Sequence, residues 1–293
     1  MIPSYEIPRQ QANVVLLGTG TPNAEPHHSG PSVAIIVNEI PYLVDCGPGV
    51  VRRAMEAYQK GTPGLNPINL QKVFLTHLHS DHTTGLPDLI LTPWVLGRDV
   101  PLELIGPFGT QGMVDHILLA YQKDIQFRID GLEHANSTGW KVNTHEIGSF
   151  SDREDQSENV FSDQNVMVEA IPVQHGNWQA FAFTFSTPEM KIVISGDTTP
   201  SELLVEKSYG CDILVHEVYS RLGFNRHTPD WQRYHQNMHT STMQLAKMAN
   251  RIRPGLLVLY HQLYWGESDA SLIKEILEHY DGEVVSGQDL DVF

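Results

Sequence analysis

The stretch FLTHLHSDH (Phe74–His82) places three histidines and one aspartate within six consecutive positions. It begins with apolar, β-favouring residues, so the cluster is expected directly after a buried strand. Residues two apart on an extended chain point the same way, and His77 and His79 can therefore hold one ion together. Asp81 and His82 come where the chain turns toward a helix and can face a second ion. The stretch therefore predicts a metal site at the end of a strand.

Two ions need more ligands, and three further side chains are placed to supply them. His175, Asp197 and His261 each come at the end of an apolar run that is typical of a buried strand. Alone, such a residue is more often a turn aspartate or a core histidine, but three of them beside the first cluster favour a shared site. Imidazole nitrogen and carboxylate oxygen suit zinc best. The sequence predicts two divalent metal ions, zinc foremost, with manganese or iron left open.

Composition limits the class of protein. The chain has 293 residues, of which 41% are hydrophobic and 18% charged, as expected of a globular fold with an ordinary core. No run of about 20 apolar residues predicts a membrane helix. The opening MIPSYEIPRQ lacks the layout of a secretory signal. Two cysteines, Cys46 and Cys211, lie in apolar runs and are read as buried thiols, which favours a cytoplasmic location.

The formal net charge of −16 counts against nucleic acid as the main partner, because an acidic chain repels polyanions at long range. Strand-like and helix-like segments alternate along the chain without a Gly/Ser-rich or Pro-rich linker. One predicted helix covers residues 109–123, and residues 151–163 are predicted as an acidic surface loop or hairpin tip. We therefore expect a single α/β domain over residues 1–293, built from two similar halves.

With these motifs the sequence resembles the metallo-β-lactamase-fold hydrolases over nearly its whole length. The resemblance implies an αββα four-layer sandwich with two ions at one edge. It assigns one ion to His77, His79 and His175, the other to Asp81, His82 and His261, and the bridging position to Asp197. It also implies that Asp45, in Val44-Asp45-Cys46-Gly47, steadies the ligands from behind, although an ordinary turn aspartate would look the same.

Two further motifs resemble the ribonuclease Z branch of this family and its arylsulfatase-like relatives. They are Leu214-Val215-His216-Glu217 and His239-Thr240-Ser241-Thr242. The resemblance implies that His239 donates a proton or stabilises an oxyanion, and that Glu217 orients His239. We predict Asp81, His239 and Glu217 as the catalytic residues, and a structural role for His216.

Ribonuclease Z enzymes carry a long tRNA-gripping arm between the third-motif histidine and the bridging aspartate. Here His175 and Asp197 are only 22 positions apart, which leaves room for a hairpin and no arm. The segment 219–238 instead gathers aromatic and cationic side chains between the two later motifs. Its candidate substrate-binding residues are Tyr219, Phe224, Arg226, Trp231 and Tyr234. A dimer contact, or a loop folded on its own core, explains this segment nearly as well.

We therefore expect an enzyme that hydrolyses small anionic esters, either phosphodiesters or aryl sulfates. A water shared by two ions would lose a proton near pH ~7 and attack phosphorus or sulfur in line. The alternatives are tRNA 3′ processing, as by ribonuclease Z, and lactone or thioester hydrolysis on the same ions. The expected partner is a small-molecule anionic ester, with nucleic acid disfavoured, no membrane, and a homodimer left open.

Overall fold

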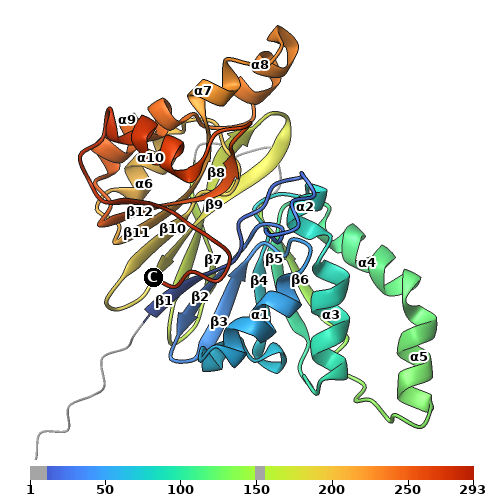
Figure 1. The fold of residues 1–293 in the computed structure, drawn as a ribbon. Helices are drawn as coiled ribbons and strands as arrows, with labels where there is room; N and C mark the ends of the chain where they lie inside the picture. The colour runs from blue at the N-terminus through green and yellow to red at the C-terminus, as the bar shows by residue number, and fades with distance from the viewer. Residues whose placement is uncertain (1–11, 149–155) are drawn as a thin grey trace, which may run out of the picture.

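The computed structural model describes residues 12–148 and 156–293 (Figure 1). Two β-sheets pack face to face, and helices cover the outer face of each sheet. This is the αββα sandwich predicted from the sequence. A central core of apolar side chains lies between the sheets, and a separate apolar layer lies under the helices on each side.

The first sheet has six strands in sequence order, with β1 to β3 antiparallel and β3 to β6 parallel. Its strands are β1 (Ala12–Gly18), β2 (Ser32–Val37), β3 (Ile40–Val44), β4 (Lys72–Phe74), β5 (Leu102–Gly106) and β6 (Val142–Glu146). The helices that follow its strands are α1 (Val50–Gln59), α2 (Ser80–Thr83), α3 (Leu86–Val95), α4 (Thr110–Ala120) and α5 (Gln122–Asp130).

The second sheet has seven strands in the order β13-β12-β11-β10-β9-β8-β7. Its strands are β7 (Glu158–Ser162), β8 (Met167–His175), β9 (Trp178–Ser186), β10 (Lys191–Ile194), β11 (Ile213–Tyr219), β12 (Leu256–Leu263) and β13 (Val284–Ser286). Its helices are α6 (Glu202–Ser208), α7 (Arg221–Phe224), α8 (Pro229–Gln236), α9 (Thr242–Ile252) and α10 (Asp269–Leu277). Strands β10 to β13 run parallel to one another.

Alternation of side chains along the strands accounts for the layers. In β2, Val33 and Ile35 face the core between the sheets, whereas Ala34 and Ile36 face α1 and its neighbours. All four side chains are buried, so β2 is covered on both faces, as expected of a strand inside a sandwich.

Two elements differ from the sequence-based expectation. The helix predicted over 109–123 is two helices, α4 and α5, which meet at Tyr121. Part of the predicted acidic loop is the edge strand β7, which pairs with β8, and residues 149–155 lie outside the described residues. Apolar periodicity alone could not locate these boundaries, because exposed edge elements carry few apolar side chains.

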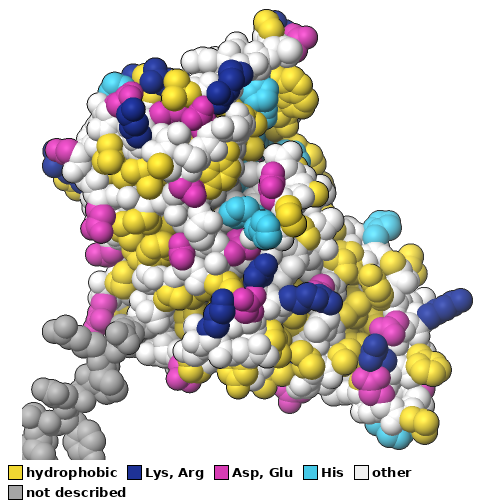
Figure 2. All heavy atoms as spheres, in the orientation of Figure 1, with side chains coloured by type: hydrophobic (Ala, Val, Ile, Leu, Met, Phe, Trp, Pro, Cys, Tyr) yellow, Lys and Arg dark blue, Asp and Glu magenta, His cyan; other side chains and the backbone are white. Residues whose placement is uncertain are grey.

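The surface matches the mixed composition. On the face in Figure 2, acidic and basic side chains are interspersed, and exposed apolar side chains accompany them. Helices α4 and α5 extend away from the body of the molecule on one side and α8 on another (Figure 1). Among the helices that the structure describes, none has the length and hydropathy that a membrane crossing requires.

Candidate metal centre

The cluster of ligand-type side chains lies where strands from both sheets end. Asp45 follows β3, the stretch with His77 follows β4, and His175 is the last residue of β8. Asp197 follows β10 and His261 lies in β12, and both of these strands belong to the second sheet, as β8 does. The carboxyl ends of parallel strands meet at one sheet edge, which is why positions far apart in the sequence converge here.

Asp45 anchors the first half of the centre. It is buried, and its backbone has a positive φ of 61°, an unfavourable conformation for a non-glycine residue. Its carboxylate accepts hydrogen bonds from the Thr76 backbone N–H at 2.8 Å and from the Thr76 hydroxyl. His82 Nδ1 donates to the same carboxylate at 2.8 Å. Asp45 therefore fixes both the loop after β4 and the orientation of the His82 ring.

Hydrogen bonds also orient two other rings. His175 Nδ1 donates to the carbonyl of Met238 at 2.7 Å, because a carbonyl can only accept. His77 Nδ1 lies 2.9 Å from the Thr76 hydroxyl, which in turn donates to Asp45. In each case the Nδ1 atom is engaged and the Nε2 atom remains for a metal. Metal-binding histidines are commonly fixed in this way.

Asp197 lies at the middle of the cluster. Its Oδ2 atom is 3.9 Å from His77 Nε2 and 3.9 Å from His175 Nε2. The same oxygen is 3.6 Å from His261 Nε2, and Oδ1 is 3.5 Å from His82 Nε2. One carboxylate thus faces imidazoles from both groups, which is the placement that a bridging ligand needs.

A β-bulge aims His261 at the centre. The pairing between β11 and β12 passes from Glu217–Tyr260 to Val218–Gln262, so His261 is the extra residue. Its φ is +47°, and its Nε2 atom lies 3.3 Å from Asp81 Oδ2. Bulges commonly redirect a side chain next to a functional site.

The side chains fit metal ions. The ligand atoms of His77, His79, His175 and Asp197 lie within 4.8 Å of one another, and so do those of Asp81, His82 and His261. Buried Nε2 atoms of His77 and His82, and Oδ1 of Asp197, have no hydrogen-bond partner among the described residues. Such buried polar atoms are costly unless they are paired, and a cation would pair them. The nitrogen and carboxylate donor set suits zinc.

The pKa shifts fit the same interpretation. Burial lowers the pKa of His79 and of His175 to about 4, so both rings are neutral near pH 7, as a metal ligand must be. Burial acts in the same direction at His82, but the carboxylates of Asp197 and Asp45 raise its pKa well above the usual value. Negative charge is therefore concentrated beside the second group, where a cation would be attracted.

His239 and Glu217, which the sequence analysis predicts as catalytic residues, lie next to each other beside the cluster. His239 Nδ1 lies 3.3 Å from Glu217 Oε1 and 3.9 Å from Asp197 Oδ2. Glu217 is fully buried and accepts backbone hydrogen bonds from Thr198 and Thr240 at 3.2 and 3.0 Å. These bonds fix the carboxylate, and the carboxylate faces Nδ1 of His239.

The structure separates the five predicted substrate-binding residues into two sets. Tyr219 and Phe224 are buried and stack on each other at 5.1 Å, so neither ring is available to a ligand. These two assignments were wrong because aromatic content alone does not tell a core cluster from an open surface. Arg226 is exposed and pairs with Glu267.

Trp231 and Tyr234 are the exposed aromatic residues among the five. Both lie on α8, with exposed fractions of 54% and 44%. Burial and the carboxylates of Asp197 and Asp81 raise the pKa of Tyr234, which places its hydroxyl within electrostatic reach of the cluster.

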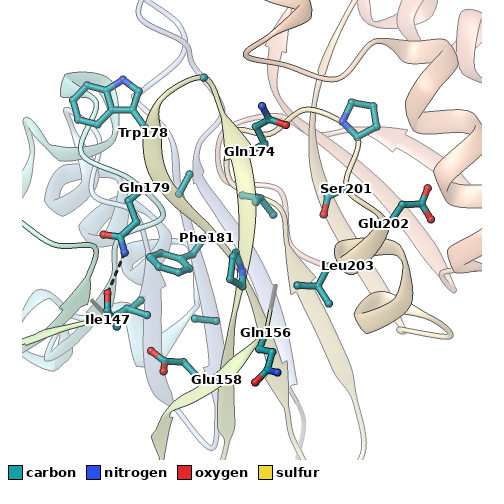
Figure 3. Close-up of a pocket in the computed structure, with 17 residues that line it drawn as sticks. Ile147, Gln156, Glu158, Gln174, Trp178, Gln179, Phe181, Ser201, Glu202 and Leu203 are labelled. Carbon is teal, nitrogen blue, oxygen red and sulfur yellow. Dashed lines mark hydrogen bonds between the residues drawn. The ribbon is translucent and has the colours of Figure 1, made fainter. Parts of the chain in front are cut away.

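The sequence interpretation missed one aromatic residue at the centre. Trp178 starts β9, directly opposite His175 across the tip of the β8–β9 hairpin, and its ring packs on His79 with centroids 4.7 Å apart. A cavity of about 660 Å³ begins at Trp178 and follows the hairpin toward Gln179 and Phe181 (Figure 3). The sequence could have predicted this position, because a two-residue hairpin turn directly after His175 places Trp178 opposite that histidine.

Comparison with known proteins gives a consistent picture. The Beta-lactamase superfamily domain matches residues 41–262. The Ribonuclease Z of Mycobacterium bovis (strain BCG / Pasteur 1173P2) is 32% identical over 255 residues, which cover 85% of each chain. That of Mycobacterium avium (strain 104) is 34% identical, also over 85% of each chain.

Solved structures with the same fold include human tRNase Z, short form, and a metallo-β-lactamase fold protein from Bacillus subtilis. The first has a TM-score of 0.71 at 24% identity and covers 96% of this chain and 98% of its own. The second has a TM-score of 0.70 at 16% identity, with coverage of 96% and 98%.

The relatives named Ribonuclease Z overturn the predicted partner, a small-molecule ester with nucleic acid disfavoured. That prediction rested on the net charge of −16 and on the short segment between His175 and Asp197. Net charge sums over the whole surface, whereas screening limits each exposed charge to about 8 Å at physiological salt. A site that holds divalent cations can therefore receive a phosphate group in an acidic chain.

Proposed function

The chain belongs to the β-lactamase superfamily of metal-dependent hydrolases, and we propose that it is an endonuclease that processes the 3′ side of precursor tRNA, as a ribonuclease Z does. The observation that carries the proposal is the match to the mycobacterial enzymes of that name, at 32% identity over 85% of both chains. The position of the ligand cluster and of the His239–Glu217 contact at one edge of the sandwich supports the proposal.

We propose that one ion is held by His77, His79 and His175, and the other by Asp81, His82 and His261. Asp197 would contact both, and zinc is the metal that this donor set suits best. Bound divalent ions supply an acidified water and offset the negative charge that develops on a phosphodiester. The protein contributes orientation, because Asp45 and the Met238 carbonyl hold the His82 and His175 rings by their Nδ1 atoms.

His239 is the proposed hydrogen-bond donor to the oxygen that leaves. Burial lowers its pKa to about 4, and burial together with Asp197 raises that of Glu217 well above the usual range. A ring with so low a pKa is neutral near pH 7, so it can donate a hydrogen bond but does not carry an extra proton to transfer. Of the two predicted roles, this favours stabilisation of the developing oxyanion over transfer of a full proton.

The segment between His175 and Asp197 is short in the structure as well. Strands β9 and β10 are joined by a tight turn over Thr187–Met190, where the Thr187 N–H donates to the Met190 carbonyl at 2.8 Å. RNA must therefore be gripped by other surfaces, of which α8 and the β8–β9 hairpin lie beside the centre. We place the reaction in the cytoplasm, since Cys46 and Cys211 are both buried free thiols.

The proposal is tested with a precursor tRNA that carries a labelled 3′ trailer, incubated with the purified protein and zinc or manganese. We expect one endonucleolytic cut that releases the trailer intact, and no cut with the Asp81→Asn variant. Intact precursor, from protein of full metal content that hydrolyses a bis-aryl phosphate, would overturn the assignment.

A further inference from the structure

The metal centre opens to solvent at His79. The other proposed ligand side chains are at most 7% exposed, whereas His79 is half-buried. A substrate phosphate therefore reaches the centre past His79. An exposed side chain that borders His79 is therefore placed to contact a group next to that phosphate.

Trp178 is a partly exposed side chain that borders His79. Its ring meets the His79 ring edge-to-face, with an interplanar angle of 70°, and 45% of the residue is exposed. The hairpin tip that carries it is fixed, because the Gly176 N–H donates to the Asn237 carbonyl at 3.0 Å. Aromatic side chains are costly to leave in water, and an indole held at the mouth of a polar site can stack a flat ligand.

The side chains that line the cavity beyond Trp178 suit a nucleobase better than a phosphate group. Its described lining includes the amides of Gln174 and Gln179 and the ring of Phe181, and no Lys or Arg. Two carboxylates, Glu158 and Glu202, also line it and would repel a phosphate (Figure 3). The volume of about 660 Å³ exceeds what one nucleoside needs.

We propose that Trp178 is a stacking platform for an unpaired base next to the scissile phosphate, with the cavity receiving that base or its neighbour. This inference deepens the proposed function and rests on it for the identity of the RNA. Base stacking on an aromatic ring tolerates any sequence. Binding through base stacking also suits a chain of net charge −16, because it does not depend on Lys or Arg contacts to phosphates.

The test compares two ligands of equal charge: a short labelled single-stranded RNA with phosphorothioate linkages that slow cleavage, and an all-abasic chain of the same length. Their affinities are measured by fluorescence anisotropy with metal-loaded protein. We expect the wild type to prefer the RNA by about 10-fold. Trp178→Ala should lose that preference, and Trp178→Phe should keep most of it.

Phe127→Ala is the matched control, because Phe127 is an exposed aromatic residue on α5, 78% exposed, and lies outside the centre. This variant should keep the wild-type preference. If Trp178→Ala also keeps it, or weakens both ligands equally while losing metal, Trp178 only supports His79 and the inference is wrong. Cleavage of precursor tRNA without base preference would leave the proposed function standing, and base preference without cleavage would leave the inference standing.

Discussion

At the scale of single residues, the centre depends on which ring nitrogen of each histidine is already engaged. His82 Nδ1 donates to Asp45 and His175 Nδ1 donates to a backbone carbonyl, so in both rings Nε2 remains for the proposed ions. The sequence could predict the residue types, since the spacing in HLHSDH is highly specific. It could not predict tautomers, because the Met238 carbonyl that fixes His175 belongs to a different part of the chain.

The prediction at the residue scale concerns the loss of the His239 imidazole. Replacing His239 by Ala should lower turnover of precursor tRNA by about 100-fold or more, because the leaving oxygen loses its hydrogen-bond donor. Metal content should remain at the wild-type value, since His239 is not among the proposed ligands. Rates come from single-turnover cleavage and metal content from elemental analysis.

Glu217→Gln supplies the control, because its amide oxygen can still accept from the Thr198 and Thr240 N–H groups and face His239 Nδ1. It should retain more activity than Glu217→Ala. A His239→Ala variant with full turnover, or one that loses its metal, would show that the ring has a different role.

At the scale of elements, what matters is where strands stop. Strands β3, β4, β8 and β10 each end at or beside a side chain of the centre, and apolar runs in the sequence predicted these ends. The bulge at His261 was beyond such prediction, because an extra residue in β12 leaves the apolar pattern unchanged while it rotates one side chain. The Tyr219–Phe224 core was missed for a related reason, since an aromatic segment does not show which way its rings face.

The prediction at the scale of elements concerns Asp45. This residue follows β3, and its carboxylate is hydrogen-bonded to the loop after β4 and to α2. Asp45→Asn should weaken zinc affinity by about 10- to 100-fold, since His82 loses a charged acceptor. The affinity is measured by competition with a fluorescent chelator. Asp212→Asn is the matched control, because Asp212 directly precedes β11 and accepts from Lys191 N–H at 2.7 Å, away from the cluster. If the two variants bind zinc with equal affinity, Asp45 does not support the metal site and is only a turn residue.

At the scale of the whole molecule, each proposed ion draws ligands from both sheets. His77 and His79 reach one ion from the first sheet and His175 from the second, while Asp81 and His82 face His261 in the same way. The ions would therefore act as links across the sandwich as well as reactants. The sequence predicted this architecture through its family resemblance, but not the helical extensions α4–α5 and α8 that project from the body.

The prediction at this scale is that removal of the metal lowers the thermal stability of the protein. An ion at about 100 times its dissociation constant stabilises the folded state by about 2.7 kcal/mol. Chelation should therefore lower the melting temperature by about 5 °C or more, and added zinc should restore it. A His79→Ala/His261→Ala variant should respond far less, because each ion has lost a ligand. If the chelator leaves the melting temperature of the wild type unchanged, the ions do not join the two sheets.

The division of ligands between the sheets also bears on the period of synthesis. His77 to His82 leave the ribosome well before His175, Asp197 and His261, so a nascent chain that has formed only its first sheet holds an incomplete set for either ion. Such a chain would be inert toward the RNA around it. Activity would begin only when the last ligand strand has been added, which makes hydrolysis a late event in the life of each molecule.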